Sequence, residues 1–337
     1  MLMKPTYKFS IISAVYNTAE YLREMIESVI GQDIGFEENV QLILVNDGST
    51  DHSKEICLRY SRQYPNNIIY LEQQNLGVSE ARNRGVAHAT GEYVNFLDSD
   101  DYLDKQALSE VYKFFCEYSD EIDLVAIPLY FFDKVIGEHI LNYKFKKQGI
   151  IDISKQHTYI QLSAASSFIR NDVIDKYRFS SKLKYAEDAE VITKVILKKG
   201  KYGVISNVYY YYRRRQDNSS AIQNAYCKEW YLDYIKEFSN QMLVLAKRER
   251  KYIDYIGYLI LYDLQWRINQ MRYIKNILDE QDYRQYIKIF IQIIKEVNLK
   301  SILEQKQINI KRKSILLGIR YSKYQWLSES LLAVLCK

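Results

Sequence analysis

Short apolar runs alternate with amphipathic stretches over the first hundred residues of the chain. The apolar runs lie at residues 9–15, 41–45, 68–71 and 93–97 and have the length of buried strands. The intervening segments place apolar side chains at helical spacing, over residues 19–30, 50–64 and 78–89. This alternation predicts an α/β fold with a mainly parallel central sheet and helices on both faces. Ligands of such sheets bind at the carboxyl ends of the strands.

The middle of the chain is less regular. Residues 124–130 predict a further strand, followed by an amphipathic stretch to about Leu162. The tyrosine run at 209–212 predicts another strand, whose rings we expect to pack rather than to stack on sugars.

Glycine and proline almost disappear from the last third of the chain. All three prolines precede residue 129, and only Gly257 and Gly318 follow Gly203. Because helices tolerate both residue types poorly, this region is predicted to be mostly α-helical. A chain of 337 residues also exceeds the usual size of one domain. We therefore expect a catalytic domain over residues 1–221 and a helical domain over 222–337.

Composition and charge narrow the class of protein. The chain is 47% hydrophobic and 26% charged, which is typical of globular proteins. Its four cysteines are far apart, so neither a zinc site nor a disulfide framework is expected. It has no apolar run of membrane-spanning length and no signal peptide pattern, which predicts a cytoplasmic protein.

The two parts differ in charge. Residues 1–220 carry a net charge of −3 and residues 221–337 a net charge of +8. The basic, apolar segment at 311–335 has three readings: contact with the inner membrane surface, self-association, or packing on the catalytic domain. Nucleic acid is not expected as a partner, because the aromatic residues follow a buried pattern.

Polar side chains follow every predicted strand. The most acidic of these segments, Asp98-Ser99-Asp100-Asp101, follows the fourth strand. Carboxylates this close repel one another unless a cation neutralises them, and oxygen ligands suit Mg²⁺ or Mn²⁺. An acidic turn before a helix is the alternative.

Two other residues carry candidate chemistry. Asp47 follows the second strand and can accept the imide N–H of uracil, although Asp-Gly is also a common turn. Arg82 lies near the start of the third helix, where it can approach the base or a phosphate, or pair with a neighbouring acid.

Four ordered segments, at 9–17, 44–51, 74–85 and 91–103, resemble family 2 glycosyltransferases of the GT-A fold. The resemblance implies binding of a UDP-sugar and transfer with inversion. It implies a metal, Mn²⁺ or Mg²⁺, held by Asp100 and Asp98. The residues implied for donor binding in this part of the chain are Val15, Tyr16, Asn17, Asp47, Arg82, Asp98 and Ser99.

The resemblance thins beyond residue 118. Asp188, in an acidic pair at a predicted helix start, is the implied catalytic base, with Glu187 beside the acceptor; Glu187 or Glu190 are the alternatives. Arg213, Arg214 and Arg215 suit the diphosphate, in a loop over the donor. Ser166 and Ser167 are acceptor candidates, or only packing residues. Relatives that add a histidine ligand place it after the base, where this chain has none.

Together these features predict an inverting glycosyltransferase. It is expected to move a hexose-type sugar from a UDP-sugar to a hydroxyl of a glycan or lipid-linked glycan. Capsule, teichoic acid and other envelope polysaccharides are open as products. The alternative is a catalytically inert UDP-binding module. A nucleotidyltransferase is disfavoured, because the first strand is not followed by a glycine-rich basic loop.

Overall fold

The computed structural model describes residues 7–183, 185–216 and 227–335, which form two compact units. The first unit comprises Met1–Ile151, Gln161–Lys182 and Glu187–Ser219. The second comprises Asp152–Ile160, Leu183–Ala186 and Ser220–Lys337. The domain boundary expected near residue 222 falls within 217–226, outside the described residues.

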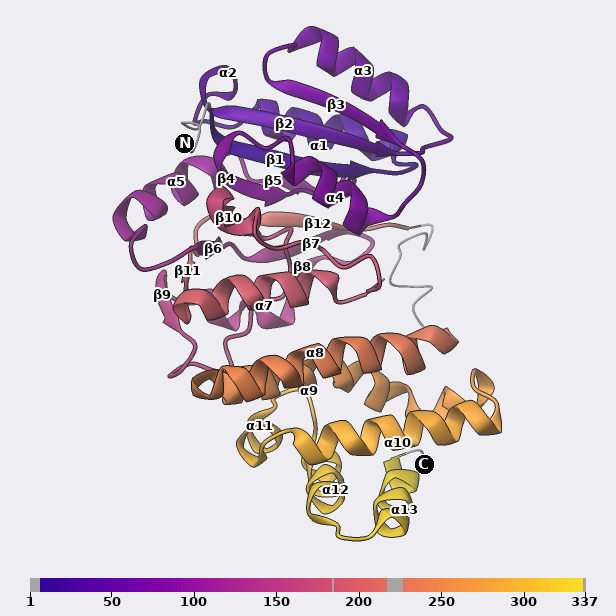
Figure 1. Ribbon diagram of the computed structural model, residues 1–337. Coiled ribbons are helices and arrows are strands. Elements are labelled where there is room, and N and C mark those ends of the chain that lie inside the picture. Colours follow the sequence, from indigo (N-terminus) through magenta and orange to yellow (C-terminus); the bar gives the residue numbers. More distant parts are fainter. Residues whose placement is uncertain (1–6, 184, 217–226, 336–337) are drawn as a thin grey trace. The chain divides into compact units, whose positions relative to one another are not determined.

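The predicted alternation of strands and helices is confirmed in the first unit (Figure 1). Its four leading strands are parallel neighbours in the order β3-β2-β1-β4. These strands are β1 Tyr7–Val15, β2 Val40–Asp47, β3 Ile68–Gln73 and β4 Gly91–Phe96. The helices among them are α1 Ala19–Ile30, α2 Phe36–Asn39, α3 Ser53–Gln63 and α4 Val78–Val86.

Helix α4 lies directly against β1. A Cβ atom at Gly85 would stand 2.3 Å from Cγ2 of Ile12, so only glycine permits this approach. The close packing fixes the height of α4 above the sheet, and with it the position of Arg82.

The same sheet continues with strands of mixed direction, in the order β4-β10-β6-β11-β9. β10 is antiparallel to both β4 and β6, while β11 is parallel to β6. These elements are α5 Ala107–Tyr118, β6 Leu124–Ala126, β9 Gly149–Asp152, β10 Ser167–Arg170, α6 Asn171–Ile174, α7 Glu187–Lys199 and β11 Lys201–Val204.

The single strand predicted at residues 124–130 is wrong. β6 ends at Ala126, and β7, Leu129–Asp133, belongs to a second sheet. The backbone changes partners at Pro128, which has no N–H to donate: Ile127 N donates to Ser166, and the Pro128 carbonyl accepts from Tyr210. The amphipathic stretch predicted to end near Leu162 forms the 3₁₀ helix η1 (Ile140–Phe145) and β9.

The second sheet has four strands in the order β5-β12-β7-β8. Its other members are β5 Tyr102–Leu103, β8 Gly137–Glu138 and β12 Tyr210–Arg214. Successive side chains of β12 point to opposite faces. Tyr210 is fully buried in the hydrophobic core, whereas Tyr211 stays partly exposed. The expectation that the tyrosine run packs is therefore confirmed for one face only.

The second unit confirms the predicted helical region. Its main helices are α8 Ile235–Arg248, α9 Ile253–Gln270, α10 Glu280–Glu296, α11 Leu299–Glu304, α12 Ile310–Tyr321 and α13 Gln325–Leu335 (Figure 1). Arg267 of α9 is buried and stacks 4.1 Å above the ring of Trp230, with Asp263 as its ion-pair partner. Among the residues described, none of the helices has the length and apolar character needed to cross a membrane.

Candidate active site at the strand ends

The carboxyl ends of β1, β2 and β4 lie together, because these strands are parallel neighbours. Tyr16 follows β1 and is 47% exposed, whereas Val15 is fully buried in the core. The side chain oxygen of Asn17 accepts a 2.8 Å hydrogen bond from the backbone N–H of Thr50. Of the donor-binding residues predicted here, Tyr16 therefore presents its ring outward, while the Val15 side chain faces the core.

Asp47 anchors the loop between β3 and α4. Its Oδ1 accepts from Leu76 N and from Gln73 Nε2, each at 2.8 Å, and its Oδ2 accepts from Gly77 N at 2.9 Å. A carboxylate offers about four lone-pair directions, so one remains for a ligand. The predicted uracil contact remains a prediction. The structure adds a second role for Asp47, since Gly77 immediately precedes α4.

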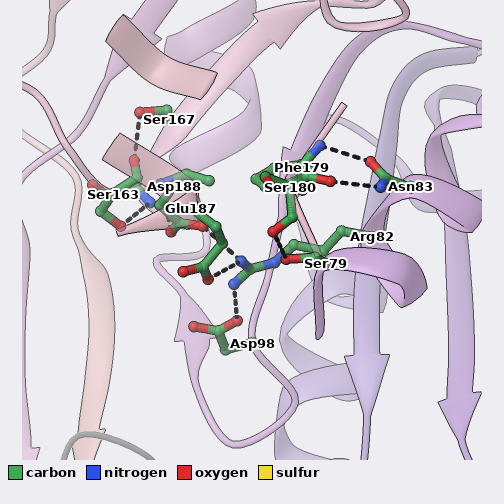
Figure 2. A network of polar contacts seen from close by, with 12 residues as sticks. Ser79, Arg82, Asn83, Asp98, Ser163, Ser167, Phe179, Ser180, Glu187 and Asp188 are labelled. Atoms are coloured by element: carbon green, nitrogen blue, oxygen red, sulfur yellow. Dashed lines mark hydrogen bonds and ion pairs between the residues drawn. The ribbon is translucent and has the colours of Figure 1, made fainter. Parts of the chain in front are cut away.

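Arg82 of α4 joins three carboxylates from distant parts of the chain (Figure 2). Its Nη2 donates to Asp98 at 3.0 Å, and its Nη1 donates to Glu187 at 3.1 Å and to Asp188 at 2.6 Å. The Arg82 side chain is 6% exposed. Of the roles predicted for this residue, pairing with neighbouring acids is the one seen. Charge-assisted bonds of this kind are strong and hold the carboxylates in place.

The segment before α7 is fastened to α4 by a second contact. Asn83 donates from Nδ2 to the Phe179 carbonyl at 2.9 Å and accepts from the Phe179 N–H at 2.8 Å. Ala186 then has a φ of +65°, an uncommon and strained angle for a residue with a side chain. The chain thus enters α7 in a fixed conformation that presents Glu187 and Asp188 to Arg82.

The two acids at the start of α7 have perturbed pKa values. Burial raises the pKa of Glu187 to about 8, and the neighbouring Asp188 carboxylate adds to this rise. Burial also raises the pKa of Asp188, against the opposing effect of Arg82. The Oδ2 atom of Asp188 accepts from Ala164 N at 3.0 Å. The pKa of Glu187 therefore lies near neutral pH, and the pKa of Asp188 is shifted in the same direction.

Glu190, the third candidate for the catalytic base, lies outside the group of acids that Arg82 contacts. It is 3% exposed and forms an ion pair with Lys194 on its own helix. The ion-pair partners of Arg82 are Asp98, Glu187 and Asp188 instead.

The aspartate segment after β4 is tied to β12. Asp101 is buried and accepts from the Tyr210 hydroxyl and from Arg213 N, each at 2.7 Å. The same Tyr210 hydroxyl accepts from Asp98 N at 3.2 Å. Burial and the neighbouring Asp100 charge raise the pKa of Asp101 well above its usual range. Tyr210 thus links the first and last residues of the segment.

The three arginines after the tyrosine run have different surroundings. Arg213 stacks 4.4 Å from the ring of Phe132, and its Nε donates to the Asp100 carbonyl at 2.9 Å. Arg215 donates from Nε to Oδ2 of Asp100 at 2.8 Å. Arg214 lies 5.6 Å from the ring of Phe131. The prediction that the arginines lie in a loop is wrong for two of them, because Arg213 and Arg214 belong to strand β12.

Carboxyl groups outnumber arginine side chains at this edge. Five carboxyl groups meet three arginines, which leaves room for a divalent cation; the acids are Asp98, Asp100, Asp101, Glu187 and Asp188, and the bases are Arg82, Arg213 and Arg215. Burial raises the pKa of Asp100, although Arg215 opposes this. Arg82 binds one carboxylate oxygen of Asp98, and Arg215 binds one carboxylate oxygen of Asp100. Across the described ranges, no group of three or more His, Cys, Asp or Glu is arranged as a metal site.

The remaining predicted residues are buried. Ser99 accepts from the Thr18 hydroxyl at 3.0 Å, which ties the aspartate segment to the start of α1. Ser166 and Ser167 are 4% and 0% exposed, and Gln161 donates to both hydroxyls. The structure thus shows packing roles, and contact with an acceptor remains a prediction.

Sequence reasoning placed Asp101 only in the acidic segment and Tyr210 only in the packing tyrosine run, and did not connect the two residues. The available signal was the alternation within the tyrosine run, which places every second ring on the side of the core. Asn83 was also missed, because its partner Phe179 lies 96 residues away and no local pattern connects them.

The fold is that of the GT-A glycosyltransferases. The parallel strands with acidic residues at their carboxyl ends are consistent with this class. It matches the crystal structure of Staphylococcus aureus TarS 1-349 in complex with UDP-GlcNAc, with a TM-score of 0.75 and 22% identity. The match covers 98% of this chain and 90% of that one. The chain belongs to glycosyl transferase family 2, whose family model matches residues 10–178.

Two curated relatives from Bacillus subtilis (strain 168) extend over most of the chain. The minor teichoic acid biosynthesis protein GgaB is 38% identical over 305 residues, covering 90% of this chain but 34% of GgaB. The minor teichoic acid biosynthesis protein GgaA is 34% identical over 307 residues, covering 88% of this chain and 68% of GgaA. The chain thus spans about a third of the first relative and two thirds of the second.

Proposed function

We propose that the chain is an inverting glycosyltransferase that moves a hexose-type sugar from a UDP-sugar to a hydroxyl of a glycan acceptor. Family membership supports the reaction type. The UDP-GlcNAc complex of TarS supports a UDP-sugar donor, and the names of GgaB and GgaA support a teichoic acid or related envelope polysaccharide as the product. The acceptor is a glycan or a lipid-linked glycan.

The placement of Asp188 carries the proposal. Arg82 holds one of its oxygens, and the other accepts from Ala164 N, which fixes the carboxylate at the strand edge. Oδ2 keeps a second lone pair for the hydroxyl proton of the acceptor. Asp188 takes that proton while the acceptor oxygen attacks the anomeric carbon opposite the departing UDP. Its raised pKa brings it closer to the ideal range for this exchange.

The opposite side of the reaction needs positive charge for the diphosphate. Arg213, Arg214 and Arg215 are the candidates as a group, although Arg213 and Arg215 each also donate to Asp100. Asp98 and Asp100 would hold Mn²⁺ or Mg²⁺, and the excess of carboxylates supports this fit. When bound, the cation neutralises charge that develops on the leaving diphosphate.

The first experiment is UDP release from a panel of UDP-sugars, with Mn²⁺, Mg²⁺ or EDTA, beside thermal stabilisation by UDP. The Asp188→Asn variant should keep UDP affinity within about twofold and lose transfer by about 100-fold or more. Asp175→Asn, an exposed aspartate, is the control.

Transfer retained by Asp188→Asn would move the base to Glu187 or Glu190. UDP binding without any turnover by the unmodified chain would favour the inert module instead. The absence of both binding and turnover would end the nucleotide-sugar proposal.

We also propose that residues 1–221 are the catalytic part and that the helical part works at the cytoplasmic face of the membrane. The support is a cluster of exposed rings beside basic residues: Tyr321, Tyr324 and Trp326 are 62%, 62% and 64% exposed. Flotation with anionic vesicles tests this. Binding unchanged in Trp326→Ser would remove these rings from the contact, and self-association of the helices is then the alternative.

A further inference from the structure

One face of the four-stranded sheet carries a continuous group of aromatic rings. Its members are partly exposed, and we call them the aromatic face: Tyr102, Tyr130, Phe132, Tyr209 and Tyr211. In the sheet register, Tyr211 pairs with Tyr102 on one side and with Tyr130 on the other. Directly paired residues point to the same side of a sheet, so these three rings form a row across three strands.

The rings contact one another. Tyr102 and Tyr211 are stacked, with centroids 4.5 Å apart, and Tyr102 meets Phe132 edge-on at 4.8 Å. Tyr130 meets Tyr209 at 5.9 Å and Tyr211 at 6.0 Å. Together these contacts make one surface rather than five isolated side chains.

The fold does not need these rings for its core. The opposite face of the same sheet supplies the core residues, with Leu103 3% exposed and Tyr210 fully buried. A contiguous group of partly exposed rings outside the core can serve as a binding surface.

The aromatic face begins where the aspartate segment ends. Tyr102 directly follows Asp101, whose carboxylate accepts from Tyr210 and from Arg213 N. Arg213 pairs with Phe132 in the register, and its Nε donates to the Asp100 carbonyl. The face is therefore continuous, through the backbone and through Arg213, with the candidate active site.

We propose that the aromatic face binds sugar units of the acceptor glycan and guides them toward Asp188. This rests on the proposed function, for which it supplies the acceptor subsite. Sugar rings present C–H groups, which suit the negative faces of aromatic rings, and hydroxyls, which suit the phenolic oxygens. The face offers rings and phenols, and its neighbouring cation Arg213 is already committed to Asp100 and Glu24. The chemistry thus fits neutral saccharide units rather than lipid phosphate or a polynucleotide.

The test is saturation-transfer NMR with soluble chito-, cello-, malto- and galacto-oligosaccharides of four to six units. The unmodified chain should bind at least one of them, with the strongest saturation on sugar C–H protons. Tyr211→Leu and Tyr102→Leu should each weaken that binding by about tenfold. The control is Tyr118→Leu, a partly buried tyrosine of α5, which should stay within about twofold. Circular dichroism and thermal unfolding, measured on every variant, verify folding.

Two results would overturn the inference: no oligosaccharide binds the unmodified chain, or binding is the same in both leucine variants. A dimer in sedimentation that both variants abolish, without saccharide binding, would assign the face to a second copy of the chain and also overturn it. Hydrolysis of UDP-sugars without an acceptor is followed separately. Saccharide binding lost in the variants supports the face even if no UDP-sugar is hydrolysed, in which case only the proposed function fails.

Discussion

Replacing Arg82 by methionine tests whether the three-carboxylate contact holds the site together. The Arg82 side chain is 6% exposed, and its guanidinium lies within 3.1 Å of oxygens from Asp98, Glu187 and Asp188. Methionine keeps much of the length and removes the charge. Removing one partner of a buried ion pair costs about 3–5 kcal/mol, because the remaining charge is left uncompensated. We expect the free energy of unfolding to fall by that amount at pH 8.

The loss of stability in Arg82→Met should depend on pH. The direction of this dependence follows from the carboxyl groups that lose their partner. Without Arg82, the folded-state pKa values of Glu187 and Asp188 rise further above their unfolded values, because Arg82 opposes both rises. The folded variant then binds more protons than the unfolded chain, so its stability declines as pH rises through those pKa values. The difference between the variant and the unmodified chain should therefore be smaller at pH 5 than at pH 8.

Denaturant unfolding followed by circular dichroism, in EDTA at both pH values, measures this difference. The matched control is Arg84→Met on the same helix, where one exposed hydrogen bond to the Glu72 carbonyl is lost. That control should cost no more than about 1 kcal/mol. Equal losses in the two variants, or a loss for Arg82→Met that does not change with pH, would refute the reasoning.

Three further predictions address the neighbouring groups. Asp100→Ala should weaken metal-dependent UDP binding in a titration of Mn²⁺; an unchanged metal requirement would remove Asp100 as a ligand. Tyr210→Phe should lower the free energy of unfolding by about 1–3 kcal/mol, since the buried Asp101 carboxylate loses a donor. A Tyr210→Phe variant as stable as the unmodified chain would show that the linkage contributes nothing. Because the pKa of Glu187 is raised to about 8, its contribution to stability is present below pH 4.5 and lost as pH rises toward 8. Glu187→Gln should flatten that decline in metal-free unfolding measurements, and an unchanged slope would contradict the assignment.

The parallel half of the fold was predictable because its strands are marked locally. Each apolar run between amphipathic segments became a strand, with β1 and β4 within two residues of the expected bounds. The single strand at 124–130 failed because periodicity cannot show that the backbone changes sheets at Pro128. The return of residues 152–160 to the second unit has no local signal either.

The site was predictable as a set of residues but not as a set of contacts. The motif pattern singled out Asp98, Glu187 and Asp188, yet nothing in the spacing indicated that the Arg82 guanidinium joins all three. The sequence could not distinguish the roles of the three consecutive arginines. The structure does so, because Arg213 and Arg214 lie in strand β12 and point to opposite faces of the sheet. Contacts of this kind are set by tertiary packing rather than by local propensity.

The long separation between Arg82 and its partners has a consequence for synthesis on the ribosome. Glu187 and Asp188 lie 105 and 106 residues after Arg82 in the chain. At roughly 5–20 residues per second, the ribosome needs about 5–20 seconds to add them. For most of that interval Asp98, which lies 16 residues after Arg82, is the one carboxylate of the three that has been synthesised. The emerging chain is then an incomplete folding unit, and the site is finished only when α7 docks.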